Sequence, residues 1–159
     1  SLTGNVSISA QLTLTQAVGL ITSRSSRLNY TKSVDYTDGG GALQAQQLYH
    51  ATRTLGGSSE TLDLAGSLSV DGVTFNPTEL KGLIVRNNHA TQPLVLGNAA
   101  SNAWSAMLGA TGTLTIPPKT TFAVLSEDAT GYAVTGGTDD QLKVAGTTGQ
   151  TYDLILFGN

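Results

Sequence analysis

The stretch that decides the fold is Asp128–Asn159, which reads DATGYAVTGGTDDQLKVAGTTGQTYDLILFGN. It holds three short segments in which apolar and polar residues alternate, separated by clusters of Gly, Thr and Asp. The apolar positions are Tyr132 and Val134, then Leu142 and Val144, then Tyr152, Leu154 and Leu156. A period of two places the side chains of each set on one face of a strand. The stretch therefore predicts three strands, over 131–135, 141–145 and 151–157, that cover a core.

The same alternation continues upstream to Tyr49, with turn residues between the segments. Short strands at intervals of roughly 8–12 residues are typical of sandwiches and barrels. We therefore expect an all-β fold, an antiparallel β-sandwich of jelly-roll type, over residues 48–159, with an up-and-down barrel as the alternative. The loop 97–109 is expected to hold a brief helical turn. The expected strands lie near 49–55, 60–64, 67–70, 79–86, 93–96, 112–116 and 120–125, before the three already described.

Residues 1–47 look different from the rest and are predicted to form an extended N-terminal arm with a Gly-rich connection. Residues 4–15 alternate and suggest a strand or strand pair at an edge or an intersubunit contact. Residues 16–47 lose the pattern, and 42–49 could form one or two helical turns. Tyr30 and Tyr36 lie outside any alternation, so each marks either a contact surface or a loop packed back on its own domain. The candidate partner-binding residues are Val6, Ile8, Leu12, Leu14, Tyr30 and Tyr36.

Composition excludes several classes of function. Only 12% of residues are charged, against roughly a quarter in an average chain, and the formal net charge is -3. Nucleic-acid binding is not expected, because it requires clustered Lys and Arg. The chain has no cysteine, so packing or assembly must stabilise it. No apolar run approaches the roughly 20 residues that span a bilayer. The start, Ser1-Leu2-Thr3-Gly4, is interpreted as that of a cytoplasmically made protein without its initiator Met.

Candidate chemistry is sparse, and we expect no catalytic residue, no cofactor and no metal site. His50 and His89 are far apart in sequence, and no nucleophile motif accompanies them. The acidic pair Asp139-Asp140 is interpreted as turn-capping rather than as calcium ligands. Trp104 is interpreted as a core residue, with stacking on a sugar as the alternative.

Three runs together resemble a known family. They are 52–66 (TRTLGGSSETLDLAG), 80–87 (LKGLIVRN) and 128–156, which contains DATGYAVT, DQLKV and YDLIL. These strand-and-turn patterns resemble the small structural proteins of tailed bacteriophages, and the similarity covers most of the chain, least in 16–47. The resemblance implies a virion component without enzymatic activity, and it transfers no functional residue.

Two roles within a virion are compatible with this resemblance. The first is a capsid decoration (cement) protein that binds and stabilises the shell of major capsid protein from outside. Such a protein would be made in the host cytoplasm and would form a homo-oligomer, a trimer rather than a dimer. The alternative is a tail, neck or fibre component that binds a receptor glycan through Trp104 and the loop tips. A virion glycanase is the least favoured class.

Overall fold

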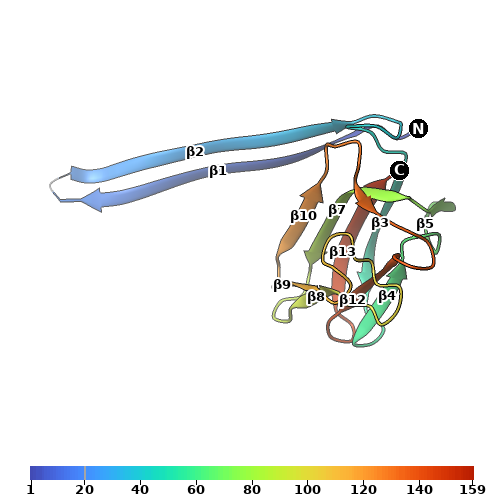
Figure 1. Ribbon diagram of the computed structural model, residues 1–159. Coiled ribbons are helices and arrows are strands. Elements are labelled where there is room, and N and C mark those ends of the chain that lie inside the picture. The colour runs from blue at the N-terminus through green and yellow to red at the C-terminus, as the bar shows by residue number, and fades with distance from the viewer. Residues whose placement is uncertain (20) are drawn as a thin grey trace.

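Every regular element of the protein is a β-strand in the computed structural model, which describes residues 1–19 and 21–159 (Figure 1). No helix that could span a membrane occurs in these described residues. The strands are β1 (Gly4–Val18), β2 (Ile21–Tyr36), β3 (Gln47–Thr54), β4 (Ser59–Asp63), β5 (Leu68–Val70), β6 (Val73–Phe75), β7 (Glu79–Asn87), β8 (Leu94–Gly97), β9 (Thr113–Ile116), β10 (Thr121–Leu125), β11 (Tyr132–Ala133), β12 (Gln141–Ala145) and β13 (Thr151–Gly158).

Two antiparallel sheets form the body of the molecule. One has the order β10-β7-β13-β3, with β11 pairing a further part of β7, and the other has the order β4-β12-β8-β9. A single cluster of buried side chains joins them, with Leu83 and Leu154 from the first sheet and Leu96 and Val144 from the second. The predicted all-β fold of antiparallel sheets is therefore confirmed, and the arrangement is that of a β-sandwich.

The C-terminal stretch behaves largely as its pattern predicts. β12 matches the predicted 141–145, and β13 extends the predicted 151–157 by one residue. The apolar set of these two strands is buried: Leu142, Val144, Tyr152, Leu154 and Leu156. The first predicted strand is shorter, because only Tyr132 and Ala133 pair with β7. Val134 is nevertheless buried, and its N–H donates to the Thr78 carbonyl.

A small hairpin, β5–β6, was only half predicted. The strand expected near 67–70 is β5, but β6, which follows the turn at Asp71-Gly72, was not expected. Asp71 and Gly72 have φ values of 51° and 77°, and positive φ at both central residues is the type I′ turn that suits a two-residue hairpin. Phe75 in β6 is buried, and the centroid of its ring lies 6.1 Å from that of the Tyr49 ring.

The N-terminal part departs most from expectation. Residues 21–36 are a strand, β2, that pairs antiparallel with β1 over its length, so the prediction of a patternless connection over 16–47 was wrong. The helical turns suggested over 42–49 are absent there, because β3 begins at Gln47. Residues 97–109 contain one hydrogen-bonded turn, from the Gly109 N–H to the Ser105 carbonyl at 2.7 Å, and no helix.

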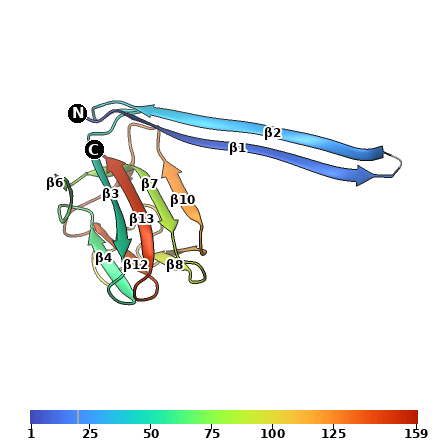
Figure 2. The same ribbon diagram turned by 180° about the vertical axis from the view of Figure 1, so that it is seen from behind.

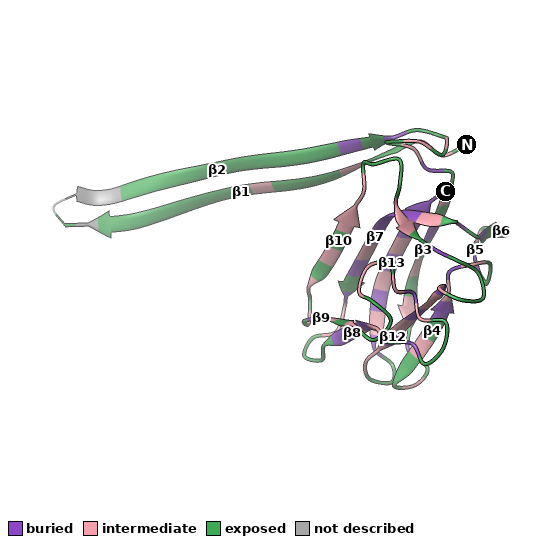
Figure 3. Cartoon of the chain, in the orientation of Figure 1, coloured by how far each residue is buried: buried purple, intermediate pink, exposed green. Residues whose placement is uncertain are grey.

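We call residues Gly4–Tyr36 the N-terminal hairpin. It projects from the body, with only its base near the sheets, as the two opposite views show (Figures 1 and 2). β1 has 15 residues, which at about 3.3 Å per residue gives a length of roughly 50 Å. Exposed residues dominate the hairpin (Figure 3), and its two buried positions, Val34 and Tyr36, lie in β2 near the body.

Candidate interaction surface

The pairing register sorts the residues of the N-terminal hairpin onto two very different faces. Residues directly opposite each other on antiparallel strands share a face, and Val6 pairs with Val34, Ala10 with Tyr30 and Leu12 with Leu28. One face is therefore mostly apolar from Val6 to Leu14 and from Leu28 to Tyr36. Lys32 opposite Ile8 and Ser26 opposite Leu14 interrupt it, and the polar pair Gln16 and Arg24 follows farther out. We call this set the apolar face: Val6, Ile8, Ala10, Leu12, Leu14, Leu28, Tyr30, Val34 and Tyr36.

The opposite face is polar throughout its described length. It carries Asn5, Ser7, Ser9, Gln11, Thr13 and Thr15 on β1, and Ser25, Arg27, Asn29, Thr31, Ser33 and Asp35 on β2. Asn5 Nδ2 donates to Ser33 Oγ and to Asp35 Oδ1, each at 2.6 Å. Such a face needs no protein cover, because water satisfies its remaining hydroxyl and amide groups.

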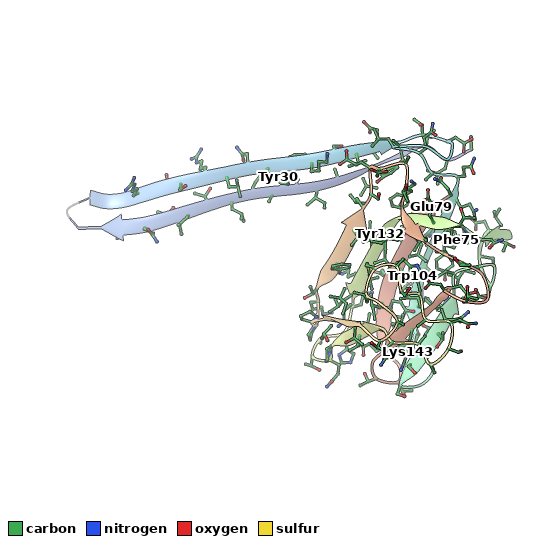
Figure 4. The ribbon with its side chains drawn as sticks, in the orientation of Figure 1. Tyr30, Phe75, Glu79, Trp104, Tyr132 and Lys143 are labelled. Atoms are coloured by element: carbon green, nitrogen blue, oxygen red, sulfur yellow. The ribbon has the colours of Figure 1, made fainter. Side chains whose placement is uncertain are left out.

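Among the residues that the structure describes, none covers the outer part of the apolar face. Exposed fractions are 47% for Ile8, 63% for Leu12, 58% for Leu14, 51% for Leu28 and 53% for Tyr30. Tyr30 lies along the projecting part of the hairpin, away from the body (Figure 4). A lone two-stranded hairpin is at best marginally stable in water, and grouped exposed apolar residues mark contact sites. The structure therefore points to a macromolecular contact along this face.

The predicted partner-binding residues divide into two groups. Ile8, Leu12, Leu14 and Tyr30 share the exposed apolar face. Val6 is half-buried at the base, and Tyr36 is 3% exposed, so the reading of Tyr36 as a contact-surface residue was wrong and its alternative, packing against its own domain, holds. Leu28 was missed, although it lies two residues before Tyr30.

The base of the apolar face packs on the body. The Tyr36 ring meets the Phe157 ring edge-on, with centroids 4.9 Å apart. Val34, Tyr36, Ala45 and Phe157 form a small buried cluster, with Leu2, Val6 and Leu125 packed around it. The Tyr36 hydroxyl donates to the Ser126 carbonyl at 2.8 Å. Burial, and secondarily the nearby Glu127 carboxylate, raises the pKa of Tyr36.

An ion pair adds a second tie between the hairpin and the body. Lys32 Nζ lies 2.6 Å from Glu127 Oε1, with both side chains nearly half exposed. The hydrogen bond to Glu127 and its charge raise the pKa of Lys32. A pair this exposed contributes little stability, but it helps to fix the direction in which the hairpin leaves the body.

Beside this base lies an open groove of about 330 Å³, which we call the outer groove. Its floor is the outward-facing side of the β10-β7-β13-β3 sheet, where Leu48, Ile84, Ile155 and Phe157 lie, and residues 2–7 form its other wall. Ile84 pairs with Ile155 across β7 and β13, and Leu48 pairs with Phe157 across β3 and β13. Leu48 is 43% exposed. The groove is thus a second apolar surface on the same molecule.

The residues considered for chemistry have structural roles. Trp104 is buried, its Nε1–H donates to the Ala133 carbonyl at 2.8 Å, and its ring meets Tyr132 edge-on, as Figure 4 places them. Its interpretation as a core residue is confirmed, and it is not available to stack on a sugar. Asp139 accepts hydrogen bonds from the N–H and hydroxyl of Ser105, and Asp140 accepts from the Gly137 N–H. Asp140 thus caps an N–H of its own turn, as predicted, whereas Asp139 binds a loop 34 positions away and is not a turn cap.

A partly buried ion pair links the two sheets. Arg53 in β3 binds Glu60 in β4 with Nη2 2.5 Å from Oε2, and the Tyr152 hydroxyl donates to Glu60 Oε1 at 2.7 Å. Burial alone would raise the pKa of Glu60, but the hydrogen bonds from Arg53 and Tyr152 lower it overall. Burial and the bond to Glu60 raise the pKa of Tyr152. Every member has a partner, so the network is a structural tie.

Lys81 is fully buried and holds the segment that precedes β11. Its ammonium group lies 2.8 Å from Glu79 Oε1 and donates to the carbonyls of Asp128, at 2.8 Å, and Ala129. Glu79 also accepts from the Gly131 N–H. Burial alone would raise the pKa of Glu79. Its hydrogen bonds, of which the one from Lys81 has the largest effect, outweigh burial and lower the pKa overall. A lysine whose donors are used in this way is not a free nucleophile.

Within residues 1–19 and 21–159, no group of three or more His, Asp or Glu side chains is placed to hold a metal ion. A scan of the chain against protein-family models and searches against curated proteins and solved structures found no match. The candidate site is therefore defined by the molecule's own geometry, as an apolar face on a projecting hairpin and a groove at its base.

Proposed function

We propose that this chain is a non-enzymatic structural protein of a bacteriophage virion, a capsid decoration (cement) protein that binds the major capsid protein on the shell exterior and stabilises it. The observation that carries the proposal is the N-terminal hairpin, which holds five large apolar side chains in solvent, away from the chain's own core. A face of this length suits a macromolecular partner, because small ligands bind in concave pockets.

The strand order supports a jelly-roll interpretation of the body. Setting aside β5, β6 and β11, eight strands remain in two sheets of four. Along these eight strands the chain crosses to the other sheet at every connection except that from β8 to β9, which are neighbours in one sheet. This order is that of two interleaved Greek keys, the jelly roll that viral capsid and lectin domains share. Fold alone does not assign function, so the phage role also relies on the resemblance of the three sequence runs.

In the proposed mechanism the protein binds across neighbouring subunits and holds them together. The sandwich is the rigid body, and residues 1–47 are an arm that contacts capsid or sister subunits. An interface of standard size, about 1,600 Å² in total, repeated at many sites would resist the pressure of packaged DNA. Few of these contacts would depend on ion pairs, since the hairpin is rich in Ser and Thr and poor in charge, and such contacts tolerate salt.

Co-sedimentation with viral heads that lack the protein tests this function. We expect the wild-type chain to pellet with the heads and to raise the temperature at which they release DNA. Leu12→Asp places a charge on the apolar face and should reduce binding, whereas Thr13→Asp places the same charge on the polar face and should not. If the folded wild-type chain stayed in the supernatant at all concentrations, the decoration role would be refuted.

The alternative role, a tail, neck or fibre component, makes a different prediction about copy number. A decoration protein occurs in virions at a number comparable with that of the major capsid protein, whereas a tail component is far rarer. The burial of Trp104 removes the side chain proposed to stack on a receptor glycan. Quantifying the bands of a purified virion on a stained gel separates the two roles.

A further inference from the structure

We propose that the apolar face of the N-terminal hairpin is covered by the outer groove of a second copy of this chain. This inference deepens the proposed function, because it names the partner that the hairpin engages first, a sister subunit. The contact joins two different surfaces, a hairpin on one copy and a sheet face on the next. Two copies can exchange it reciprocally as an isologous dimer, and three or more copies can close it into a heterologous ring.

The first observation is that the chain already makes this kind of contact within itself. At the base of the hairpin, Val34 and Tyr36 of the apolar face pack on Phe157 of the outward-facing side of the sheet. The exposed residues Ile8, Leu12 and Leu28 continue the same face along the same two strands. The face is therefore continuous with a packed interface, and only its outer part lacks a partner.

The second observation is that the matching surface is present and open. Leu48, Ile84 and Ile155 lie beside Phe157 in the outer groove and are only partly covered. The hairpin leads away from this groove (Figures 1 and 2), so its own outer part does not lie over it. One molecule thus carries both halves of an apolar contact without being able to join them. A second copy supplies each missing half.

The third observation concerns area. From Ile8 to Gln16 the hairpin has a length of roughly 30 Å and, with two strands, a width of about 10 Å. One hairpin on one sheet face therefore buries roughly 600 Å² when both surfaces are counted. A single such contact is below the size of a stable interface, whereas two reciprocal contacts total roughly 1,200 Å² and three in a ring roughly 1,800 Å², within the range of specific assemblies.

Sedimentation velocity on the purified full-length chain, without any capsid present, tests the proposal. We expect the wild type to be a dimer or trimer. Leu12→Asp on the hairpin and Ile155→Asp in the groove should each raise the dissociation constant at least roughly tenfold. The matched controls Thr13→Asp, on the polar face, and Thr115→Asp, on the exposed side of β9, should leave it unchanged. Circular dichroism and urea midpoints verify that each variant folds.

Mixing variants identifies the two surfaces as partners. A Leu12→Asp copy keeps an intact groove, and an Ile155→Asp copy keeps an intact hairpin. A mixed pair has one intact contact, whereas a pair of identical variants has none. The mixture should therefore associate more tightly than either variant alone and less tightly than the wild type. If only hairpin variants dissociated the assembly, hairpins would pair with hairpins and the groove assignment would be overturned. A wild type that is monomeric at micromolar concentration would overturn the whole inference.

Cross-linking gives an independent test, because the chain has no cysteine. Leu12→Cys coupled to a benzophenone maleimide should cross-link to residues of β3, β7 or β13 on an unlabelled, heavy-isotope copy. Cross-links confined to one copy, or to capsid protein alone when heads are added, would contradict the proposal. Failure of the inference and failure of the proposed function are distinguishable. A chain that oligomerises but ignores heads refutes only the function, and a monomer that binds heads refutes only the inference.

Discussion

Gly82→Ala tests how the hairpin base is held on the sheet. Gly82 in β7 lies opposite Phe157 in β13, and a Cβ placed on Gly82 would come within 2.1 Å of two atoms of the Phe157 ring. The ring must therefore leave its position over the glycine. The same ring contacts Tyr36 at the base of the hairpin, so the substitution should loosen the hairpin as well as the sheet.

The expected losses of unfolding free energy can be worked out for Gly82→Ala, for Phe157→Ala and for the double variant. Forcing one extra methyl group into a filled site costs about 1–3 kcal/mol, and Phe157→Ala alone, at a nearly buried ring, should cost about 3–5 kcal/mol. In the Phe157→Ala background the space above Gly82 is empty, so Gly82→Ala should then cost less than about 0.5 kcal/mol. The coupling energy of the double-mutant cycle is thus about 1–3 kcal/mol.

Urea unfolding of the wild type, both single variants and the double variant measures this coupling. The chains should be measured at two concentrations tenfold apart, because association stabilises the folded state by mass action. Hydrogen exchange of the β2 amides near Val34 should become faster in Gly82→Ala. If Gly82→Ala cost the same free energy with and without the Phe157 ring, the ring would not be what makes glycine necessary at this position, and the reasoning would be refuted.

Three further predictions concern the body. Glu60 has a lowered pKa, so the stability it contributes is present above its unfolded value of about 4.5 and is lost as pH falls through the folded value. The urea midpoint of the wild type should therefore drop as the pH falls below about 4.5, and an equal drop in Glu60→Gln would contradict this. Asn87 is buried, and its Nδ2 donates to the carbonyls of Gln92, Ile116 and Pro117. Asn87→Ala should therefore lower the free energy of unfolding by about 2–3 kcal/mol. A loss no larger than that of the exposed control Thr115→Ala would be inconsistent with this role. Trp104→Phe removes the donor to the Ala133 carbonyl and part of a buried ring, and it should cost about 1–3 kcal/mol by urea unfolding. A glycan array should show the same binding for variant and wild type, and a binding loss specific to Trp104→Phe would argue for a sugar site.

The sandwich body could be predicted from sequence because its strands obey local rules. In β13 the alternation of Tyr152, Leu154 and Leu156 is uninterrupted, and the sheet buries that set. The turn at Asp71-Gly72 follows from residue types that accept positive φ. The order of strands within the sheets could not be derived in this way, because pairing between β3 and β13 joins residues about one hundred positions apart.

β2 was missed although a signal was present. Leu28, Tyr30, Val34 and Tyr36 alternate with polar residues, but Lys32 breaks the series and Thr, Ser and Asn dominate the rest. On β1 every alternate residue from Val6 to Leu14 is apolar, so that strand was predicted. Placing Val6 opposite Val34 and Leu12 opposite Leu28 would have revealed a hairpin with one largely apolar face, since the even-numbered positions of the two strands face each other.

The burial of Tyr36 could not be predicted from its neighbours. Its partner is Phe157, at the far end of the chain, and that contact depends on Gly82 in a third strand. The outer groove has the same origin, since Leu48, Ile84 and Ile155 come from three strands. Local patterns show which side chains share a face, and only the assembled sheet shows which faces remain open.

Electron cryomicroscopy of the intact particle tests the central claim most directly. We expect density for the sandwich body on the outside of the capsid shell, with each N-terminal hairpin lying across the outward-facing sheet of a neighbouring copy. Density for the chain confined to the tail, or its absence from purified particles, would contradict the decoration role.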